Sequence, residues 1–300
     1  MTQAKAPLDR HALGRRLSRL ANASAADLLN GQPAQSPAAY ARRIGLTGPP
    51  GAGKSTLAGH LAMYRLQGRR LGVLAIDPSS PRTGGAILGD RIRMDELAGS
   101  AELYIRSVGS RSAHDGLSDN LPEMLDTMDE FGFDEVLLET VGVGQAEYAV
   151  RAQVDTLVLV LLPESGDIVQ AMKAGIMEMA DIFVVNKADL LGAQKMVTDI
   201  KRISALAGHA ESAWRPLVLL ASSAQPETIE ALSNGIDEHQ AWLAASRGGD
   251  SLLLARARYR LRRLIERRAA DAVAALDAQA LLAPLELQLD QALQVIRNPG

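Results

Sequence analysis

Residues 43–55 read Arg-Ile-Gly-Leu-Thr-Gly-Pro-Pro-Gly-Ala-Gly-Lys-Ser. The apolar run Ile44–Thr47 predicts a strand, and Ser55–Gln67 predicts a helix. Between them, Gly48–Ser55 has the spacing of a phosphate-binding P-loop: Gly, four residues, then Gly-Lys-Ser. Glycines let backbone N–H groups approach phosphate oxygens, and the helix N-terminus adds positive potential. This stretch predicts a nucleotide-binding loop, although a glycine-rich strand–helix turn without a ligand is the simpler alternative.

The side chains of the loop fit that chemistry. We expect Lys54 to neutralise charge on the β- and γ-phosphates and the Ser55 hydroxyl to ligate Mg²⁺. The expected nucleotide-binding residues of this segment are Gly48, Gly51, Ala52, Gly53, Lys54, Ser55 and Thr56.

Short apolar runs alternate with helical stretches over the rest of the central chain. The further predicted strands are Leu71–Ile76, Leu103–Ser107, Val136–Leu138, Thr156–Leu162, Ile182–Val185 and Leu217–Leu220. The predicted helices between them are Leu121–Phe131, Ile168–Met179, Met196–Leu206 and Thr228–Leu243. Buried strands joined by crossover helices form a mostly parallel, doubly wound sheet. The fold class is therefore α/β, a P-loop NTPase fold.

Helical segments flank this region on both sides. Leu8–Asn30 reads as one helix, Leu252–Leu276 carries an apolar stripe at helical spacing, and Leu285–Ile296 reads as a shorter helix. We expect an N-terminal helical extension over residues 1–40, a nucleotide-binding domain over 41–245 and a C-terminal helical segment over 246–300. The apolar stripe suits either a dimer contact or packing on the chain's own domain.

Composition excludes several classes of protein. The 300 residues carry 32 Lys and Arg against 35 Asp and Glu, so the formal net charge of −3 does not indicate nucleic acid or anionic lipid as a partner. The absence of cysteine excludes disulfides, thiolate metal sites and a cysteine nucleophile. The longest apolar run, Thr156–Pro163, is far shorter than the roughly 20 residues of a membrane helix. We expect a cytoplasmic protein without a membrane segment.

A second motif points to the base of the nucleotide. Asn186-Lys187-Ala188-Asp189 follows the predicted strand Ile182–Val185. An Asp at this point can accept hydrogen bonds from guanine N1–H and the exocyclic amine, which adenine lacks. Asn186 would brace the loops, and the Lys187 stem would lie along the base. Ser222, Ser223 and Ala224 form a weaker candidate contact with the guanine edge.

Acidic residues at strand ends predict the rest of a Mg²⁺ site. Glu139 ends the run Val136–Leu138, and Asp77 and Asp90 flank a loop rich in Gly, Ser and Pro. The expected metal ligands are these three carboxylates and Ser55. The expected catalytic residues are the same three carboxylates and Lys54. Gly142 is expected to offer its N–H to the γ-phosphate. For Asp77 alone, a helix or turn cap is an open alternative.

Four strings together resemble the MeaB/ArgK family of P-loop GTPases, which includes the methylmalonic aciduria type A protein. The strings are Gly48–Thr56, Ile76–Arg91, Glu139–Gln145 and Asn186–Asp189. The second and third strings are much more specific than the P-loop. The resemblance implies a GTPase chaperone that gates loading, protection or reactivation of an adenosylcobalamin-dependent acyl-CoA mutase.

The resemblance also implies partners and further residues. The cofactor would be Mg²⁺ with GTP or GDP, and an adenosyltransferase is a possible second partner of the mutase chaperone. Gln170 and Lys173 match a third switch loop of the family, and family members form homodimers through their C-terminal helices. We expect slow intrinsic hydrolysis that a partner accelerates. Gln145 is either the residue that positions water or a polar residue at a helix start.

Three other functions stay open at this point. A nickel-delivery GTPase shares the P-loop class but needs Cys and His ligands. A transport-associated kinase or ATPase, the ArgK-type interpretation, would prefer ATP, and a nucleotide-dependent scaffold would hydrolyse almost nothing. Seven arginines between Arg256 and Arg268 indicate a solvated helix face more than a nucleic-acid surface, because Glu266 interrupts them and few aromatic residues accompany them.

Overall fold

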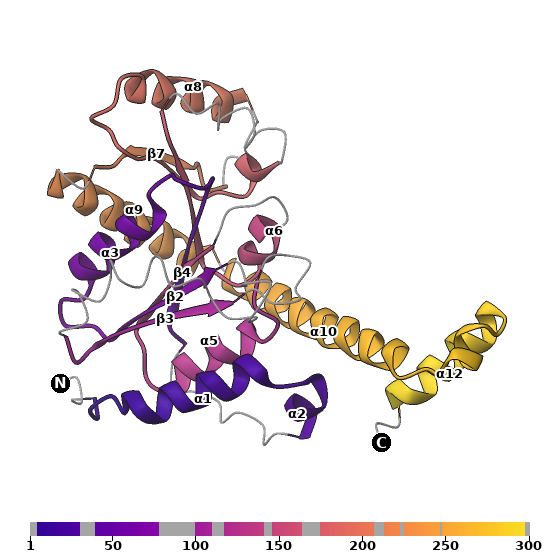
Figure 1. The fold of residues 1–300 in the computed structure, drawn as a ribbon. Coiled ribbons are helices and arrows are strands. Elements are labelled where there is room, and N and C mark those ends of the chain that lie inside the picture. The colour runs from indigo at the N-terminus through magenta and orange to yellow at the C-terminus, as the bar shows by residue number, and fades with distance from the viewer. Residues whose placement is uncertain are drawn as a thin grey trace.

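The computed structural model describes residues 5–30, 40–77, 100–109, 117–140, 146–163, 175–206, 213–222, 225–246 and 248–297. Seven strands in these ranges form one sheet with the order β3-β2-β4-β1-β5-β6-β7, and all neighbouring pairs are parallel (Figure 1). The strands are β1 (Arg42–Thr47), β2 (Leu71–Asp77), β3 (Leu103–Gly109), β4 (Glu135–Glu139), β5 (Thr156–Leu161), β6 (Ile182–Val185) and β7 (Leu217–Leu220). Each strand overlaps a predicted apolar run, so the doubly wound α/β class is confirmed.

Helices cover both faces of the sheet. They are α1 (Arg10–Asn22), α2 (Ala25–Asn30), α3 (Lys54–Arg65), α5 (Leu121–Glu130), α6 (Ala146–Arg151), α8 (Ala193–Leu206), α9 (Pro226–Ala245), α10 (Gly248–Ala274), α11 (Ala278–Leu281) and α12 (Leu285–Arg297). On one face, α3 and α9 bury Leu61 and Leu232 against the strands. On the other face, α1 and α5 bury Leu17 and Met124. The aliphatic core expected from the composition therefore lies in two layers around the sheet.

The N-terminal helix differs from its prediction. A single helix was expected over Leu8–Asn30, but the helix is interrupted at Ala23 and Ser24. The Ser24 hydroxyl accepts from the Asp27 backbone N–H at 3.1 Å, and the Asp27 carboxylate accepts from the Ser24 backbone N–H at 2.8 Å. This reciprocal capping box starts a new helix and so explains the break. The predicted helix Ile168–Met179 lies largely outside the described residues, which include only the short 3₁₀ helix Ile176–Glu178 there.

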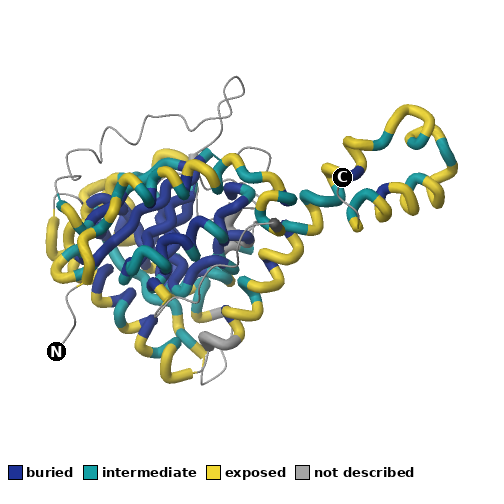
Figure 2. The backbone as a smooth tube through the Cα atoms, turned by 90° about the horizontal axis from the view of Figure 1, so that it is seen from below, coloured by how far each residue is buried: buried dark blue, intermediate teal, exposed yellow. Residues whose placement is uncertain are grey.

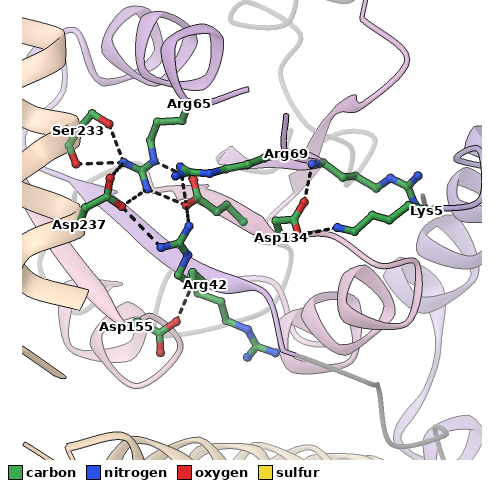
Figure 3. Close-up of polar contacts among 11 residues, drawn as sticks. Lys5, Arg42, Arg65, Arg69, Asp134, Asp155, Ser233 and Asp237 are labelled. Carbon is green, nitrogen blue, oxygen red and sulfur yellow. Dashed lines mark hydrogen bonds and ion pairs between the residues drawn. The ribbon is translucent and has the colours of Figure 1, made fainter. Parts of the chain in front are cut away.

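A buried ionic network holds α3 at the end remote from the P-loop. Arg65, in the last turn of α3, donates to Glu135 at the start of β4 through Nε and Nη2, at 2.8 and 2.7 Å. Its other contacts reach α9, where it bonds the Ser233 hydroxyl at 2.7 Å and Asp237 at 2.8 Å. Figure 3 shows Arg42 and Asp237 beside this guanidinium. The network ties α3 and α9 to the amino end of β4.

The C-terminal helices leave the body of the molecule as an arm (Figure 2). Arginines along one side of α10 bond to the body, which differs from the solvated helix face expected from the sequence. The pairs are Arg256 with Asp155, Arg260 with Asp126, Arg263 with Asp119, and Arg267 with the Ala23 carbonyl. Part of the apolar stripe remains exposed, with Leu261 at 59% and Ile265 at 56%. The arginine side of α10 therefore contacts the chain's own domain, whereas these two apolar residues face solvent.

Within the parts of the chain that the structure describes, none of the helices combines the length and the apolar character that a bilayer span requires.

Candidate nucleotide site

The sheet topology places the P-loop where nucleotides bind in α/β folds. Strand β1 has β4 on one side and β5 on the other, and its next crossover leads to β2. The carboxyl ends of β1, β4, β5 and β6 therefore meet at one edge, at the point where the strand order reverses. The P-loop follows β1, Glu139 ends β4 and the Asn186–Asp189 segment follows β6, which brings these three parts of the predicted site to the same edge.

Two glycines of the P-loop, Gly48 and Gly53, occupy positions that a side chain would block. Gly48 has φ +141°, and a Cβ there would lie 2.0 Å from the Val160 carbonyl oxygen of β5. Gly53 has φ +79°, and its Cβ would lie 2.6 Å from the Asn186 amide nitrogen. Gly51 also has a positive φ, +81°. The loop can therefore wrap closely only with glycine at these positions.

Lys54 lies inside the curve of this loop. Its ammonium donates to the Gly48 carbonyl at 2.8 Å and to the Pro49 carbonyl at 3.0 Å, and the residue is buried. Lys54 is also the first residue of α3, so its charge sits at the positive end of a helix. Anionic phosphate is the ligand that this combination favours.

Ser55 and Glu139 meet beside the loop. The Ser55 hydroxyl donates to Glu139 Oε1 at 2.5 Å, and parallel pairing of β1 with β4 sets Leu46 opposite Glu139. Glu139 is buried at 6% exposure. A hydroxyl and a carboxylate are the hard oxygen donors that Mg²⁺ prefers, so these two residues fit that ion.

The Asn186–Asp189 segment is bonded directly to the P-loop. Asn186 Nδ2 donates to the Ala52 carbonyl at 2.8 Å, which braces the two loops as expected. Lys187 takes a left-handed conformation with φ 54°, and the Ala188 N–H donates to the Ala221 carbonyl at 3.0 Å. Asp189 Oδ1 accepts from the Ser222 hydroxyl at 3.2 Å.

A pocket of about 180 Å³ lies between these segments. Its walls are the start of α3 and the residues that follow β6 and β7. The lining residues are Gly53, Thr56, Leu57, His60, Asn186, Lys187, Asp189, Ser222 and Ile229. Its apolar side chains, Leu57 and Ile229, and its one carboxylate, Asp189, suit a planar heterocycle that carries hydrogen-bond donors.

Several candidate residues lie outside the described part of the chain: Asp90, Gly142, Gln145, Gln170, Lys173, Ser223 and Ala224. Asp77 ends β2 at the same sheet edge, and only its backbone is described. Three lining residues, Leu57, His60 and Ile229, were not predicted from the sequence. Helical spacing from Thr56 identifies His60 once the base pocket is known to border α3, but nothing in the motif itself marks it.

The fold and this site define a P-loop nucleotide-binding protein. The chain belongs to the family described as methylmalonyl Co-A mutase-associated GTPase MeaB, whose model matches residues 16–278. A Pyrococcus abyssi protein named as a GTPase is 44% identical over 206 residues, which are 68% of this chain and 64% of that protein. The mitochondrial methylmalonic aciduria type A homolog of Mus musculus is 40% identical over 208 residues, 68% of this chain and 50% of that protein.

The chain thus matches less than two thirds of the length of these relatives. A solved structure described as a LAO/AO transport system kinase aligns over 98% of this chain and 100% of its own, with a TM-score of 0.61 and 22% identity. At that identity the likeness concerns the fold alone.

Proposed function

We propose that this chain binds GTP, hydrolyses it, and acts as a chaperone that gates loading, protection or reactivation of an adenosylcobalamin-dependent acyl-CoA mutase. The observation that carries the nucleotide part is the Asn186–Ala52 hydrogen bond of 2.8 Å, because it joins the loop for the base to the loop for the phosphates. The description of the family, a mutase-associated GTPase, supports the partner.

In the proposed reaction, GTP and water give GDP and phosphate. The backbone of Gly48–Gly53 and the Lys54 ammonium hold the phosphates and stabilise the negative charge of the transition state by electrostatic attraction. Ser55 and Glu139 would hold Mg²⁺, which when bound neutralises charge between the β- and γ-phosphates. Asp189 accepts from the guanine ring and selects GTP over ATP.

Positioning and charge stabilisation are all that this chain supplies in the proposal, so its hydrolysis should be slow alone. The mutase would accelerate it by contacting segments that order around the γ-phosphate, for which Asp77, Asp90, Gly142, Gln170 and Lys173 stay the candidates from the sequence. An adenosyltransferase that supplies the mutase's cofactor, and a homodimer formed through the C-terminal helices, complete the proposed assembly.

Single-turnover GTP hydrolysis tests the proposal, measured with and without purified methylmalonyl-CoA mutase. We expect slow release of phosphate from the chain alone and an increase of at least about tenfold with the mutase. Lys54→Ala is the control that should abolish both rates, because it removes the charge at the phosphates. A rate that the mutase leaves unchanged would contradict the coupling, and hydrolysis that survives Lys54→Ala would contradict the site.

A further inference from the structure

The residue that follows Ala221 after β7 holds the carboxylate proposed to recognise the base. Asp189 is exposed, so its carboxylate would turn freely in solvent if nothing held it. The Ser222 hydroxyl donates to Asp189 Oδ1 at 3.2 Å, and Ser222 itself is buried at 2% exposure. Both residues line the pocket. The position of Ser222 therefore influences how the carboxylate is turned within the pocket.

The orientation of this carboxylate matters for guanine. The N1–H and the exocyclic amine donate side by side in the plane of the ring, so two good hydrogen bonds require the carboxylate to lie close to that plane. A hydroxyl that holds Oδ1 limits rotation about the bond between Cβ and Cγ of Asp189. Each carboxylate oxygen has two acceptor sites, so Oδ1 can accept from Ser222 and from the base together. The Ser222 contact can thus favour the two-bond arrangement without removing an acceptor.

Thr228, in the first turn of α9, holds Ser222 in turn. Its Oγ1 accepts from the Ser222 backbone N–H at 3.0 Å and donates to the Gln225 carbonyl at 2.6 Å. The same oxygen lies 3.2 Å from the Ser222 carbonyl oxygen, which also accepts from the Gln225 backbone N–H at 3.0 Å. Thr228 is not among the residues that line the pocket. Its hydroxyl can therefore affect the base only through the residues that it holds.

These contacts differ from those of an ordinary helix cap. A capping side chain accepts from an N–H in the first turn of its own helix. The Thr228 hydroxyl instead accepts from Ser222, which precedes the start of α9 at Pro226 by four residues. The N-cap residue of α9 is Gln225, and its side chain makes no capping hydrogen bond. Thr228 therefore fixes the connection between β7 and α9 more directly than it stabilises the helix.

We propose that Thr228 is a positioning residue for guanine recognition, because it fixes Ser222, whose hydroxyl orients the Asp189 carboxylate. The inference rests on the proposed guanine-nucleotide function. It makes the start of α9 part of the base site, although α9 carries none of the nucleotide motifs. A neutral hydrogen bond of this kind changes an equilibrium by about threefold to tenfold.

Selection of the exocyclic amine tests this role separately from general binding. Dissociation constants would be measured for GDP and for IDP, whose base keeps N1–H but lacks the amine. The wild type should prefer GDP by at least about tenfold, because IDP loses a bond to a carboxylate. Thr228→Val keeps the shape without the hydroxyl and should reduce this preference by about threefold to tenfold. Thr228→Ser keeps the hydroxyl and should retain the preference within about twofold.

A double-mutant cycle tests whether Thr228 acts through Ser222. Ser222→Ala should reduce the preference for GDP over IDP at least as much as Thr228→Val does. The double variant should lose no more than Ser222→Ala alone. Thr198→Val is the matched control, because the Thr198 hydroxyl on α8 also donates to a backbone carbonyl, that of Gln194 at 3.0 Å, but lies outside the pocket lining. This control should keep the wild-type preference within about twofold.

The ratio of the two affinities decides the outcome. A Thr228→Val variant that binds both nucleotides more weakly but keeps the wild-type ratio would overturn the inference, because a merely structural role lowers both affinities together. Losses from Thr228→Val and Ser222→Ala that multiply independently would also overturn it. Ser222→Ala with a wild-type ratio would do so even if Thr228→Val did not fold. A wild type that binds GDP and IDP equally would overturn the proposed recognition of guanine as well.

Discussion

The hydroxyl of Ser55, at the start of α3, donates to the carboxylate of Glu139, at the end of β4, at 2.5 Å. If this pair holds Mg²⁺, the ion should strengthen GTP binding in the wild type. In Ser55→Ala that effect should fall by at least about tenfold, because one oxygen ligand is lost. Titration of GTP with Mg²⁺ and with EDTA measures it. A variant whose affinity still responds to Mg²⁺ like the wild type would remove Ser55 from the site.

His239 on α9 is a buried titratable residue that lies beside the start of β5, outside the lining of the pocket. Its Nδ1 lies 2.9 Å from the Thr156 hydroxyl and its Nε2 lies 3.3 Å from Asp181. Burial, with Arg151 nearby, lowers the pKa of His239 from 6.5 to about 4. Burial raises the pKa of Asp181 to about 6, although Arg151 opposes that shift. Folding therefore shifts both groups toward their neutral forms, relative to the unfolded chain.

The two shifts have opposite effects on stability. His239 binds a proton more readily in the unfolded chain. Its contribution to the free energy of unfolding is therefore lost as pH falls from 6.5 towards 4. Asp181 binds a proton more readily in the folded chain. Its contribution to the free energy of unfolding is therefore lost as pH rises from 3.8 to about 6. We predict that His239→Gln is less stable than the wild type at pH 7, and that the gap narrows by about 2 kcal/mol at pH 5.

Urea unfolding followed by tryptophan fluorescence measures this gap. Trp214 and Trp242, the two tryptophans of the chain, have ring centroids 4.8 and 5.7 Å from that of His239. A gap that stays constant between pH 7 and pH 5 would show that His239 is not held neutral.

Residues that belong to a motif can be predicted from the sequence. Residues that reach the site only through the packing of helices cannot. Lys54, Ser55, Asn186 and Asp189 stand at fixed spacings beside apolar strands, so their convergence at one sheet edge could be predicted. His60 carries no such signal, because its relation to the pocket depends on how α3 packs against the loops after β6 and β7.

Among the elements, α3 carries the P-loop at one end and Arg65 at the other. Arg65→Met should destabilise the fold by about 3 kcal/mol, because Glu135 is fully buried and loses its bidentate partner. Arg69→Met is the matched control. Arg69 also contacts Glu135, at 3.1 Å, but its side chain is partly exposed, so the cost should stay below about 1 kcal/mol. Urea denaturation measures the free energy of unfolding of both variants. Equal losses of stability in the two would contradict a central role for Arg65.

Strands were easier to predict than the ends and faces of helices. Continuous Val, Ile and Leu runs have only one way to be buried in a parallel sheet, which is why each strand was found. The break between α1 and α2 depends on a local cap at Ser24 and Asp27 that competes with helix continuation. The arginine side of α10 depends on acidic partners more than 100 residues away, such as Asp155 for Arg256. Spacing along the chain contains no information about them.

At the scale of the whole molecule, the arm of α10, α11 and α12 projects from the body (Figure 2). Several of its apolar residues, Leu261 and Ile265 among them, are exposed. We predict that this surface forms the homodimer. Replacement of Leu261 and Ile265 by Glu should convert the dimer into a monomer and leave GDP affinity within about twofold, because the nucleotide pocket lies elsewhere. Sedimentation analysis at micromolar concentration measures the mass.

A control separates the arm from general surface effects. Leu191 is 85% exposed on the body, and Leu191→Glu should leave the dimer intact. A wild-type chain that sediments as a monomer would contradict the dimer, and so would a double variant that still sediments at twice the monomer mass.

Guanine recognition is the claim on which the proposed nucleotide function depends, and Asp189 is the residue that tests it. The direct measurement is the set of dissociation constants for GDP, XDP and ADP with the wild type and with Asp189→Asn. The wild type should bind GDP at least about 100-fold more tightly than ADP, and the variant should lose GDP and gain XDP, because Asn can donate to the xanthine oxygen. Equal binding of GDP and ADP by the wild type, or a variant with unchanged preference, would contradict the account.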